Sequence, residues 1–402
     1  MTTTFMGYPR PDGSAGARNW VLILPVQRNM NLLAASIAKL VEGTKVMLSP
    51  GEGGRTTVDR RTIARTMVGL GQNPNVGAIL LVAIKPKFGY KELSENYFLD
   101  ELNKTGKPVR TLVLSELGGY YNALGEGVRL ARELALEASR VHRQPCPIAK
   151  LTIGVKCGMS DPTSGIVGNP VVGRMFDLLI AGGGTALFSE TTEIIGAEHL
   201  LVKRAATPEV AAALLEAVRI TENKAKSTGE DIRNINPIPS NIAAGLTTLE
   251  EKSLGAIAKS GTTPIRGVLA YGERPAGQGL YFMDAWMSSL SLPLCFAAAG
   301  AQIVLYQMGG GDLPDPCPPM PAATSGIISP LMYITGNRHT FAKAGDSMDF
   351  DSSRALGGGF TVREIGDEFL GHIIDVASGT RTRMETLRHE DPVELYFEGP
   401  SL

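Results

Sequence analysis

Polar side chains that could do chemistry follow a short apolar run near the middle of the chain. Residues 152–155 are mostly β-branched or apolar and predict a buried strand, and Lys156, Cys157 and Asp161 come directly after it. Ligands bind at the carboxyl ends of strands in open α/β sheets, and a helix that starts there can hold an anion. The alternative is an ordinary polar loop. The same stretch supplies further groups that could orient a substrate: Ser160, Thr163, Ser164 and Asn169.

A second group of candidate residues follows the next predicted strand, at 185–189. Glu190 and Glu193 come first, and Glu198 and His199 come a few residues later. Carboxylates and an imidazole at a strand's carboxyl end can bind a hard divalent cation or move protons. The structural alternatives are a helix N-terminus that favours negative charge and a histidine that only packs.

Two lysines are candidate cationic groups, Lys156 at the strand end and Lys252 in a predicted helix. A desolvated lysine can act as a base, although most lysines are solvated. Thr247 or Thr248 caps the predicted helix of Lys252, since a glutamate lies two or three residues further on, as in a capping box. The same two threonines are candidates for substrate binding.

The composition excludes several classes of function. The chain has 402 residues, a net charge of −1, 43% hydrophobic and 20% charged residues, with both signs of charge mixed along it. This predicts folded domains with a sizeable core and no nucleic-acid surface. The chain has neither a secretion signal nor an apolar run of the roughly 18 residues that a membrane span needs. Its glycine clusters match no nucleotide-binding motif, which argues against a phosphosugar or nucleotide enzyme.

The cysteines point to a reduced compartment. Their spacing contains no CxxC pair, so it supports neither a zinc knuckle nor a disulfide framework, and the cytoplasm is the expected location. Cys157 is either a metal ligand or a buried apolar side chain. The others are expected in the core or in loops: Cys146, Cys295 and Cys317.

The elements that must position these residues follow a β-α alternation. Continuous apolar strands alternate with helical patterns through residues 1–145, and the alternation resumes after the prolines of residues 144–147. We therefore predict an α/β fold of two domains, 1–145 and 146–402, each with a mostly parallel sheet flanked by helices. The second domain carries most of the candidate site residues.

Longer motifs spread over most of the chain resemble the altronate/galactarate dehydratase family, which includes the large subunit of (2R)-sulfolactate sulfo-lyase. The motifs are GYxRxxGxxGxRN at 7–19, NPNVGA at 73–78, TGKPV at 105–109, KCGxSDxxSG at 156–165, NPxVG at 169–173, ExxExxGAEH at 190–199 and GLTTxEEKSLG at 245–255.

The resemblance implies a lyase that eliminates a β substituent from a 2-hydroxy acid, such as an aldonate or aldarate sugar acid, to give a 2-keto-3-deoxy acid. It implies a divalent metal, usually iron (Fe²⁺), with Mn²⁺ or Mg²⁺ as alternatives. Family dehydratases often carry a small N-terminal domain, and this chain starts directly at the GYxR motif. A separate small subunit and an oligomer are therefore expected.

The chain departs from the family at several loops. Dehydratases often have a cysteine where this chain has Gln27, a histidine loop where it has residues 49–54, and Gly-Cys-Glu where it has residues 83–85. A glycine loop near the end becomes residues 308–312, followed by a proline-rich insertion. These differences suggest an altered substrate or a lost activity, and they weaken the case for an iron site shared with the first domain.

The sequence supports three readings of the site. In the first, a base removes the proton next to a carboxylate, the dianion is stabilised by a metal or cation, and water leaves. The second reading replaces water with sulfite, and the third is a subunit that binds sugar acids without catalysis. The predicted catalytic residues are Lys156, Asp161, Glu193, His199 and Lys252. The predicted substrate-binding residues are Ser160, Thr163, Ser164, Asn169, Thr247 and Thr248, and the predicted metal ligands are Cys157, Glu190 and Glu198.

Overall fold

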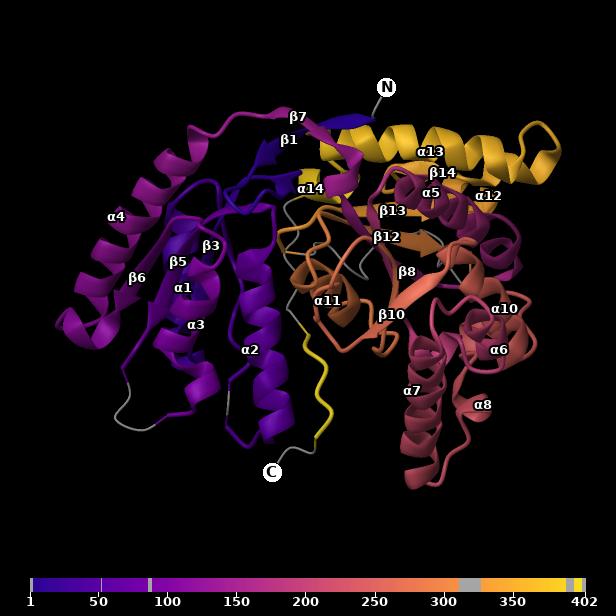
Figure 1. The fold of residues 1–402 in the computed structure, drawn as a ribbon, viewed down its shortest axis with the longest axis horizontal. Coiled ribbons are helices and arrows are strands. Elements are labelled where there is room, and N and C mark those ends of the chain that lie inside the picture. Colours follow the sequence, from indigo (N-terminus) through magenta and orange to yellow (C-terminus); the bar gives the residue numbers. More distant parts are fainter. Residues whose placement is uncertain (1–2, 52, 86–88, 311–326, 388–393, 400–402) are drawn as a thin grey trace.

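Two parallel sheets, one in each half of the chain, form the framework (Figure 1). The computed structural model describes residues 3–51, 53–85, 89–310, 327–387 and 394–399. Helices cover the faces of both sheets, so the predicted α/β class with mostly parallel sheets flanked by helices is confirmed. The predicted proline-rich insertion that follows residue 312 lies within residues 311–326, which are outside the described part of the chain.

The N-terminal sheet has four parallel strands in the order β4-β3-β5-β6. Its strands are β3 (Trp20–Pro25), β4 (Thr44–Val46), β5 (Val76–Ala83) and β6 (Val109–Val113). Its helices are α1 (Asn31–Leu40), α2 (Thr57–Gln72), α3 (Glu95–Asn103) and α4 (Tyr120–Ser139). Alternate residues of β3 face opposite sides: Val21 and Ile23 join the core under α1 and α4, and Leu22 and Leu24 the core under α2 and α3. Every residue of β5 is buried, as expected for a strand covered on both faces.

The C-terminal sheet has seven parallel strands in the order β10-β11-β9-β8-β12-β13-β14. The strands are β8 (Thr152–Gly158), β9 (Thr185–Phe188), β10 (Ile265–Leu269), β11 (Gly279–Met283), β12 (Ile303–Met308), β13 (Leu331–Thr335) and β14 (Phe350–Asp351). The chain enters at β8, adds β9 on one side and later adds β12 on the other. This reversal makes β8 the topological switch point, where parallel sheets bind ligands.

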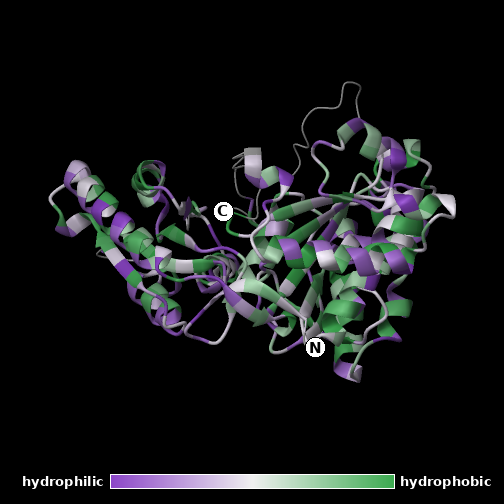
Figure 2. Ribbon diagram, turned by 90° about the horizontal axis from the view of Figure 1, so that it is seen from above, coloured by the Kyte–Doolittle hydropathy of each residue, from purple (hydrophilic) through white to green (hydrophobic). Residues whose placement is uncertain are grey.

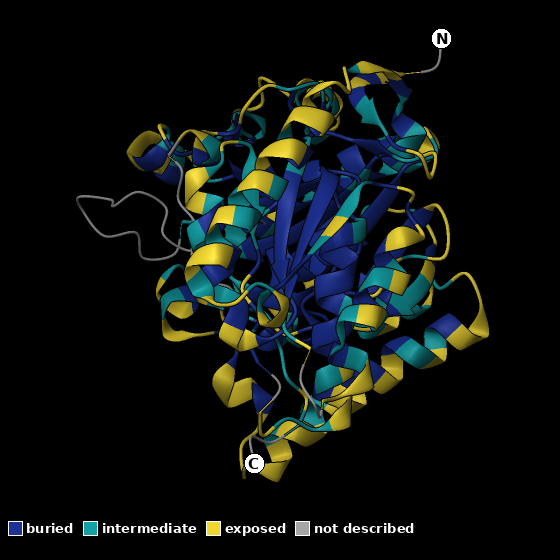
Figure 3. Cartoon of the chain, turned by 90° about the vertical axis from the view of Figure 1, so that its left-hand side faces the viewer, coloured by how far each residue is buried: buried dark blue, intermediate teal, exposed yellow. Residues whose placement is uncertain are grey.

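Helices cover both faces of the C-terminal sheet. Helices α5 (Asn169–Ala181) and α13 (Val362–Ala377) pack together on one face, and α11 (Ser291–Ala298) covers the other and contacts α2 of the N-terminal half. A π-helical turn (η5, Ser164–Gly168) precedes α5. Figure 3, which looks onto the N-terminal half, shows buried strands behind helices that have both buried and exposed residues, and Figure 2 shows that helices of both halves carry hydrophobic and hydrophilic residues.

The remaining helices lie around the C-terminal sheet. They are α6 (Glu198–Val202), α7 (Pro208–Ser227), α8 (Ile232–Ile235), α9 (Pro239–Ala243), α10 (Leu249–Ile257), α12 (Arg338–Ala344) and α14 (Arg383–Leu387). Helix α10 begins as its sequence predicts: the Thr248 hydroxyl accepts from Glu251 N, and the Glu251 carboxylate accepts from Thr247 N. Within the described residues, no helix has the length and apolar character that crossing a membrane would require.

A small antiparallel sheet and two asparagines connect the two halves. Strand β1 (Thr4–Pro9) pairs with β2 (Ala15–Gly16) and with β7 (Gln144–Pro147), so the proline-containing segment between the halves is an ordered strand. Asn73 donates to the backbone carbonyls of Ala297 and Ala301, and Asn75 donates to those of Gln302 and Ile328. All these bonds are buried, which fixes the N-terminal sheet against the C-terminal one.

Candidate active site

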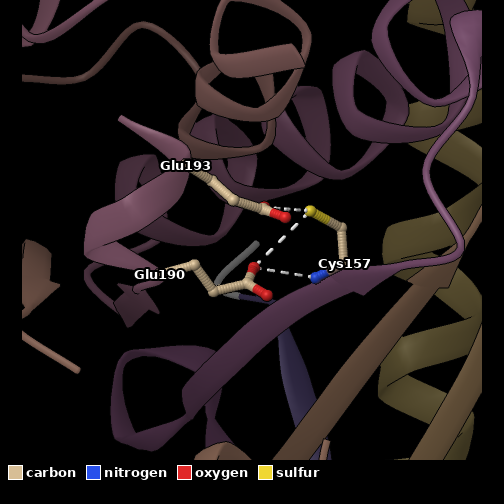
Figure 4. Close-up of side chains that lie close together, drawn as sticks. All are labelled: Cys157, Glu190 and Glu193. Carbon is tan, nitrogen blue, oxygen red and sulfur yellow. Dashed lines mark hydrogen bonds between the residues drawn. The ribbon is translucent and has the colours of Figure 1, made fainter. Parts of the chain in front are cut away.

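The carboxyl ends of β8 and β9 bring a thiol and two carboxylates together. Val155 pairs with Phe188, so Cys157 at the end of β8 and Glu190 just after β9 lie at the same edge. The Cys157 amide donates to Glu190 Oε2 over 3.0 Å, and the Cys157 thiol lies 2.9 Å from Glu193 Oε2 (Figure 4). All three side chains are buried. The structure thus joins residues of the two sequence motifs in one cluster.

The backbone at Glu190 turns its side chain back toward β8. Glu190 has φ 81° and ψ 72°, a left-handed conformation that non-glycine residues rarely adopt. The 3₁₀ turn that follows (η6, Thr191–Glu193) then aims Glu193 at the same thiol. Such a conformation persists only where the surrounding bonds hold it, and it is common at functional sites.

A third lysine, Lys259, completes the cluster. It comes from a 3₁₀ turn (η7, Ala258–Ser260) at the end of α10, and its side chain is 1% exposed. Its ammonium lies 3.1 Å from Cys157 Sγ and 3.4 Å from Glu193 Oε2, and it also bonds Glu190 Oε2. Three N–H donors therefore face three acceptors.

Lys252 and Lys156 flank this centre on opposite sides. Lys252 Nζ lies 3.2 Å from Glu193 Oε1 and donates to Asn236 Oδ1 and Asn241 Oδ1 over 2.7 and 3.1 Å. Lys156 Nζ lies 3.8 Å from Glu190 Oε1. It also contacts two hydroxyls, those of Ser289 at 3.1 Å and Tyr306 at 3.3 Å. The charged groups thus alternate along a buried row: Lys156, Glu190, Lys259, Glu193 and Lys252.

The alternation of charge sets the protonation states in this row. Burial alone would raise the pKa of Glu193, but the charges of Lys252 and Lys259 outweigh it and lower that pKa to about 2. Burial likewise opposes the charge of Lys259, yet the adjacent anionic groups raise its pKa. The pKa of Cys157 is raised by burial and by the two carboxylates, so the thiol is protonated and donates to Glu193. Glu193 is therefore a carboxylate, and Lys259 keeps its positive charge.

The thiol and the two carboxylates are a set that could hold a metal ion. Ligand atoms of Cys157, Glu190 and Glu193 all lie within 4.8 Å of one another. However, the Lys259 ammonium already bonds one ligand atom of each residue: Cys157 Sγ, Glu190 Oε2 and Glu193 Oε2. A metal needs those ligands at about 2.0–2.3 Å with the thiol deprotonated. The donor set suits a metal, but the arrangement with Lys259 in place does not.

A pocket of about 310 Å³ lies next to the row, and Lys252 belongs to both. Its polar lining includes several predicted residues: Ser160, Asp161, Ser164, Asn169 and Lys252. Asn169 Nδ2 donates to Gly255 O, while Asn169 Oδ1 is buried without a hydrogen-bond partner. A buried acceptor of this kind needs a donor, and a ligand hydroxyl is a donor.

Asp161 ties the loops of the pocket together. Its carboxylate accepts from Thr163 Oγ1 at 2.6 Å, from Gly310 N at 2.7 Å and from Asn337 Nδ2 at 2.6 Å. It also accepts from the Ser164 amide. These bonds link the end of β8 to the ends of β12 and β13, so the carboxylate and the Thr163 hydroxyl are engaged in holding the loops.

Three other predicted residue groups lie apart from the cluster. His199 is exposed on α6, because the short helix turns its imidazole outward. Glu198 is half-buried and does not share the metal-type group formed by the described residues. Thr247 and Thr248 are exposed, and their hydroxyls are used in the cap of α10. The sequence groups the His199 imidazole with the carboxylates that follow the same strand, but in the structure this imidazole lies at the surface, outside the cluster.

Sequence reasoning missed Lys259 and the neutral groups that hold the other lysines. Lys259 follows Lys252 by seven residues, about two helical turns, so the two lie on one face. That spacing was the available signal. The neutral partners carry no local signal, because they come from distant segments: Asn236, Asn241, Ser289 and Tyr306.

The fold and the site are those of an α/β protein with a buried charged cluster at a switch point, and comparison with known proteins gives the family. A family described as D-galactarate dehydratase/altronate hydrolase, second domain, matches residues 7–139, and D-galactarate/altronate dehydratase, C-terminal, matches residues 148–397. The chain belongs to the D-galactarate/altronate dehydratase family.

Individual relatives in this family are lyases. The chain is 33% identical to (2R)-sulfolactate sulfo-lyase subunit beta of Chromohalobacter salexigens, over 96% of each chain. It is 29% identical to altronate dehydratase of Bacillus subtilis, covering 94% of this chain and 74% of that one. It is 28% identical to galactarate dehydratase (L-threo-forming) of Escherichia coli, over 94% and 73%.

Proposed function

We propose that the protein is a lyase that eliminates a β substituent from a small 2-hydroxy acid, giving a 2-keto acid. One observation carries the proposal: Lys252 lines the pocket while its ammonium bonds Glu193 of the buried row. A carboxylate bound in the pocket would meet this charge. Removing the adjacent proton places a second negative charge on the substrate, and fixed cations stabilise such a dianion.

The pocket residues supply orientation in this proposal. Asn236 and Asn241 hold the Lys252 ammonium in place. Asn169 Oδ1 is available to accept from the substrate hydroxyl, and Ser160 and Ser164 line the same space. Proton transfer falls to Glu193, a carboxylate bonded by the Cys157 thiol and by two lysines. A substrate carboxylate that draws the Lys252 ammonium toward the pocket would remove the main cause of its low pKa and make it a stronger base.

The comparisons favour sulfite over water as the leaving group. The chain is 33% identical to the sulfo-lyase subunit, whereas it is 29% and 28% identical to the two dehydratases. Sulfite is also a better leaving group than water and needs less help from an acid. We therefore propose a sulfonated hydroxy acid of the sulfolactate type as substrate, with water elimination from an aldonate or aldarate as the second candidate.

A partner subunit is part of the proposal. The relative from Chromohalobacter salexigens is by name a subunit beta, and we propose that a small subunit completes this enzyme. We also propose a cytoplasmic location, since Cys146, Cys157 and Cys295 are free thiols. Co-expression with candidate small subunits and co-purification would test the partner.

A substrate panel tests the reaction. Purified protein, with and without the small subunit, is incubated with sulfolactate, altronate, galactarate and other 2-hydroxy acids, and 2-keto acid and sulfite are measured. Sulfite equal to keto acid is expected from sulfolactate, and keto acid alone from a sugar acid would favour the second candidate. Binding in calorimetry without any product would contradict the lyase and favour a binding subunit.

A further inference from the structure

We infer that Lys259 is the resident cation of the group formed by Cys157, Glu190 and Glu193, and that this site works without a divalent metal ion. The inference deepens the proposed function, because it concerns the cation that stands beside the reacting groups. It does not depend on which leaving group is released.

The first argument is the match of donors to acceptors. An ammonium has three N–H donors and no acceptor, and Lys259 has three acceptors within reach: Cys157 Sγ at 3.1 Å, Glu193 Oε2 at 3.4 Å and Glu190 Oε2. The side chain is 1% exposed, so water does not compete for these donors. One ligand atom of each of the three groups is thus already bonded by one lysine, while Glu190 Oε1 has no hydrogen-bond partner and lies 3.8 Å from Lys156 Nζ.

The second argument is the balance of charge. The buried row contains three lysines and two glutamates, and the lysines already outnumber the carboxylates. Burying an uncompensated charge is costly. A divalent ion would add two positive charges beside Lys259, and even an ionised thiol would cancel only one of them. Losing Lys259 would leave two lysines for two carboxylates, and it would leave the two carboxylates and the thiol facing one another with no cation between them.

The third argument is how the lysine is held. Lys259 is the last but one residue of η7, and Ser260 of the same turn donates to Ile257 O and accepts from Arg204. The turn is packed against α5, so the ammonium is delivered by fixed backbone. A cation fixed in this way acts as the preorganised positive charge that a metal would otherwise supply.

Cobalt absorption tests the inference directly. Co²⁺ is titrated into anaerobically purified full-length protein, and the near-ultraviolet band of a thiolate–cobalt bond is recorded. The wild-type protein is expected to give no such band. Lys259→Met is expected to give it, because the three ligands become free, and the double variant Lys259→Met with Cys157→Ser is expected to lose it again. Lys203→Met, at an exposed lysine, is the matched control and is expected to behave as wild type.

Two results would overturn the inference. One is a thiolate–cobalt band in the wild-type protein that Cys157→Ser removes. The other is a folded Lys259→Met protein, judged by circular dichroism, that binds no Co²⁺. If Lys259→Met does not fold, the wild-type titration and metal analysis of the wild-type protein still decide. Failure of the proposed function is recognised separately, as absence of keto acid from the substrate panel.

Discussion

The two parallel sheets are built on the same plan, yet among the residues that the structure describes only the C-terminal sheet carries a buried charged cluster at its edge. In each sheet the first strand is central, and the chain adds a neighbour first on one side and then on the other. The carboxyl edge of the N-terminal sheet holds neutral pairs and exposed ion pairs. Gln27 accepts from Ile84 N, Asn31 bonds Ser49, and Lys85 bonds Glu116 at the surface. At the edge of the C-terminal sheet, five acidic and basic side chains are buried in one row.

The difference shows that sheet topology creates a carboxyl edge where a site can form, but does not by itself place reactive side chains there. Both sheets have a switch point, where ligands bind in folds of this kind. In the C-terminal sheet, α10 and η7 cover the edge and exclude water, so opposite charges interact strongly there. In the N-terminal sheet, the Lys85 side chain is 56% exposed and its ion pair is screened. Burial of the edge is therefore what separates the two.

The largest expected effect comes from removing one cation from each edge. Lys259→Met leaves Glu190 and Glu193 buried without their shared partner, and breaking a buried ion pair in this way costs about 3–5 kcal/mol of unfolding free energy. Lys85→Met is expected to leave the urea midpoint unchanged. Equal midpoints for the two variants would contradict the contrast between the edges.

The second largest effect should come from lowering the pH, which reduces the stability that Glu193 contributes at the C-terminal edge. Since the pKa of Glu193 falls from 4.5 unfolded to about 2 folded, its pairing stabilises the protein fully above about pH 4.5, and this stability is lost as the pH falls toward 2. The contribution is about 3 kcal/mol. Urea unfolding from pH 7 to 3 should therefore show a decline that Glu193→Gln flattens. Glu116→Gln, at the other edge, should keep the wild-type slope, and an unchanged slope in Glu193→Gln would count against the pairing.

Substitutions at the two sheet edges should also differ in their effect on kcat. Glu193→Gln keeps the shape of the side chain but removes the carboxylate, and losing a proton-transfer group costs about 100-fold or more in kcat. Gln27→Ala and His199→Ala are expected to stay within about twofold, because neither side chain lies in the cluster. The measurement is keto acid formation at saturating substrate. A 100-fold loss in His199→Ala would return the imidazole to the mechanism.

The smallest effect should be the same in both halves. Thr56 caps α2 by accepting from Asp59 N, and Thr248 caps α10 by accepting from Glu251 N. Each threonine changed to alanine should cost about 1 kcal/mol of unfolding free energy. Activity should not change in either variant, since both hydroxyls serve helix starts. A strong loss of activity in Thr248→Ala alone would support its predicted role in substrate binding.

The α/β class was predictable because continuous apolar runs such as β5 are typical of parallel strands that helices cover on both faces. The segment at residues 144–147 was harder, since two prolines indicate a break, yet it pairs with β1 at a sheet edge. The part of the site that lies at strand ends was predictable, because Cys157 and Glu190 stand at the carboxyl ends of two neighbouring strands. Lys259 was missed because a lysine late in an amphipathic helix is usually solvated. His199 follows Glu193 closely in sequence, but nearness in sequence does not determine which face of a short helix a side chain takes.

The asparagines at residues 73 and 75 have a consequence for how the protein unfolds. Four carbonyl groups of the C-terminal half receive their donors from these two side chains. Ile63 and Met67 of α2 share a core with Phe296 of α11. An isolated N-terminal fragment would expose that apolar face to solvent, and the rest would lose the four hydrogen bonds from the two asparagines. The intact chain should therefore melt in a single calorimetric transition, and neither fragment should be recovered as a stable product of limited proteolysis.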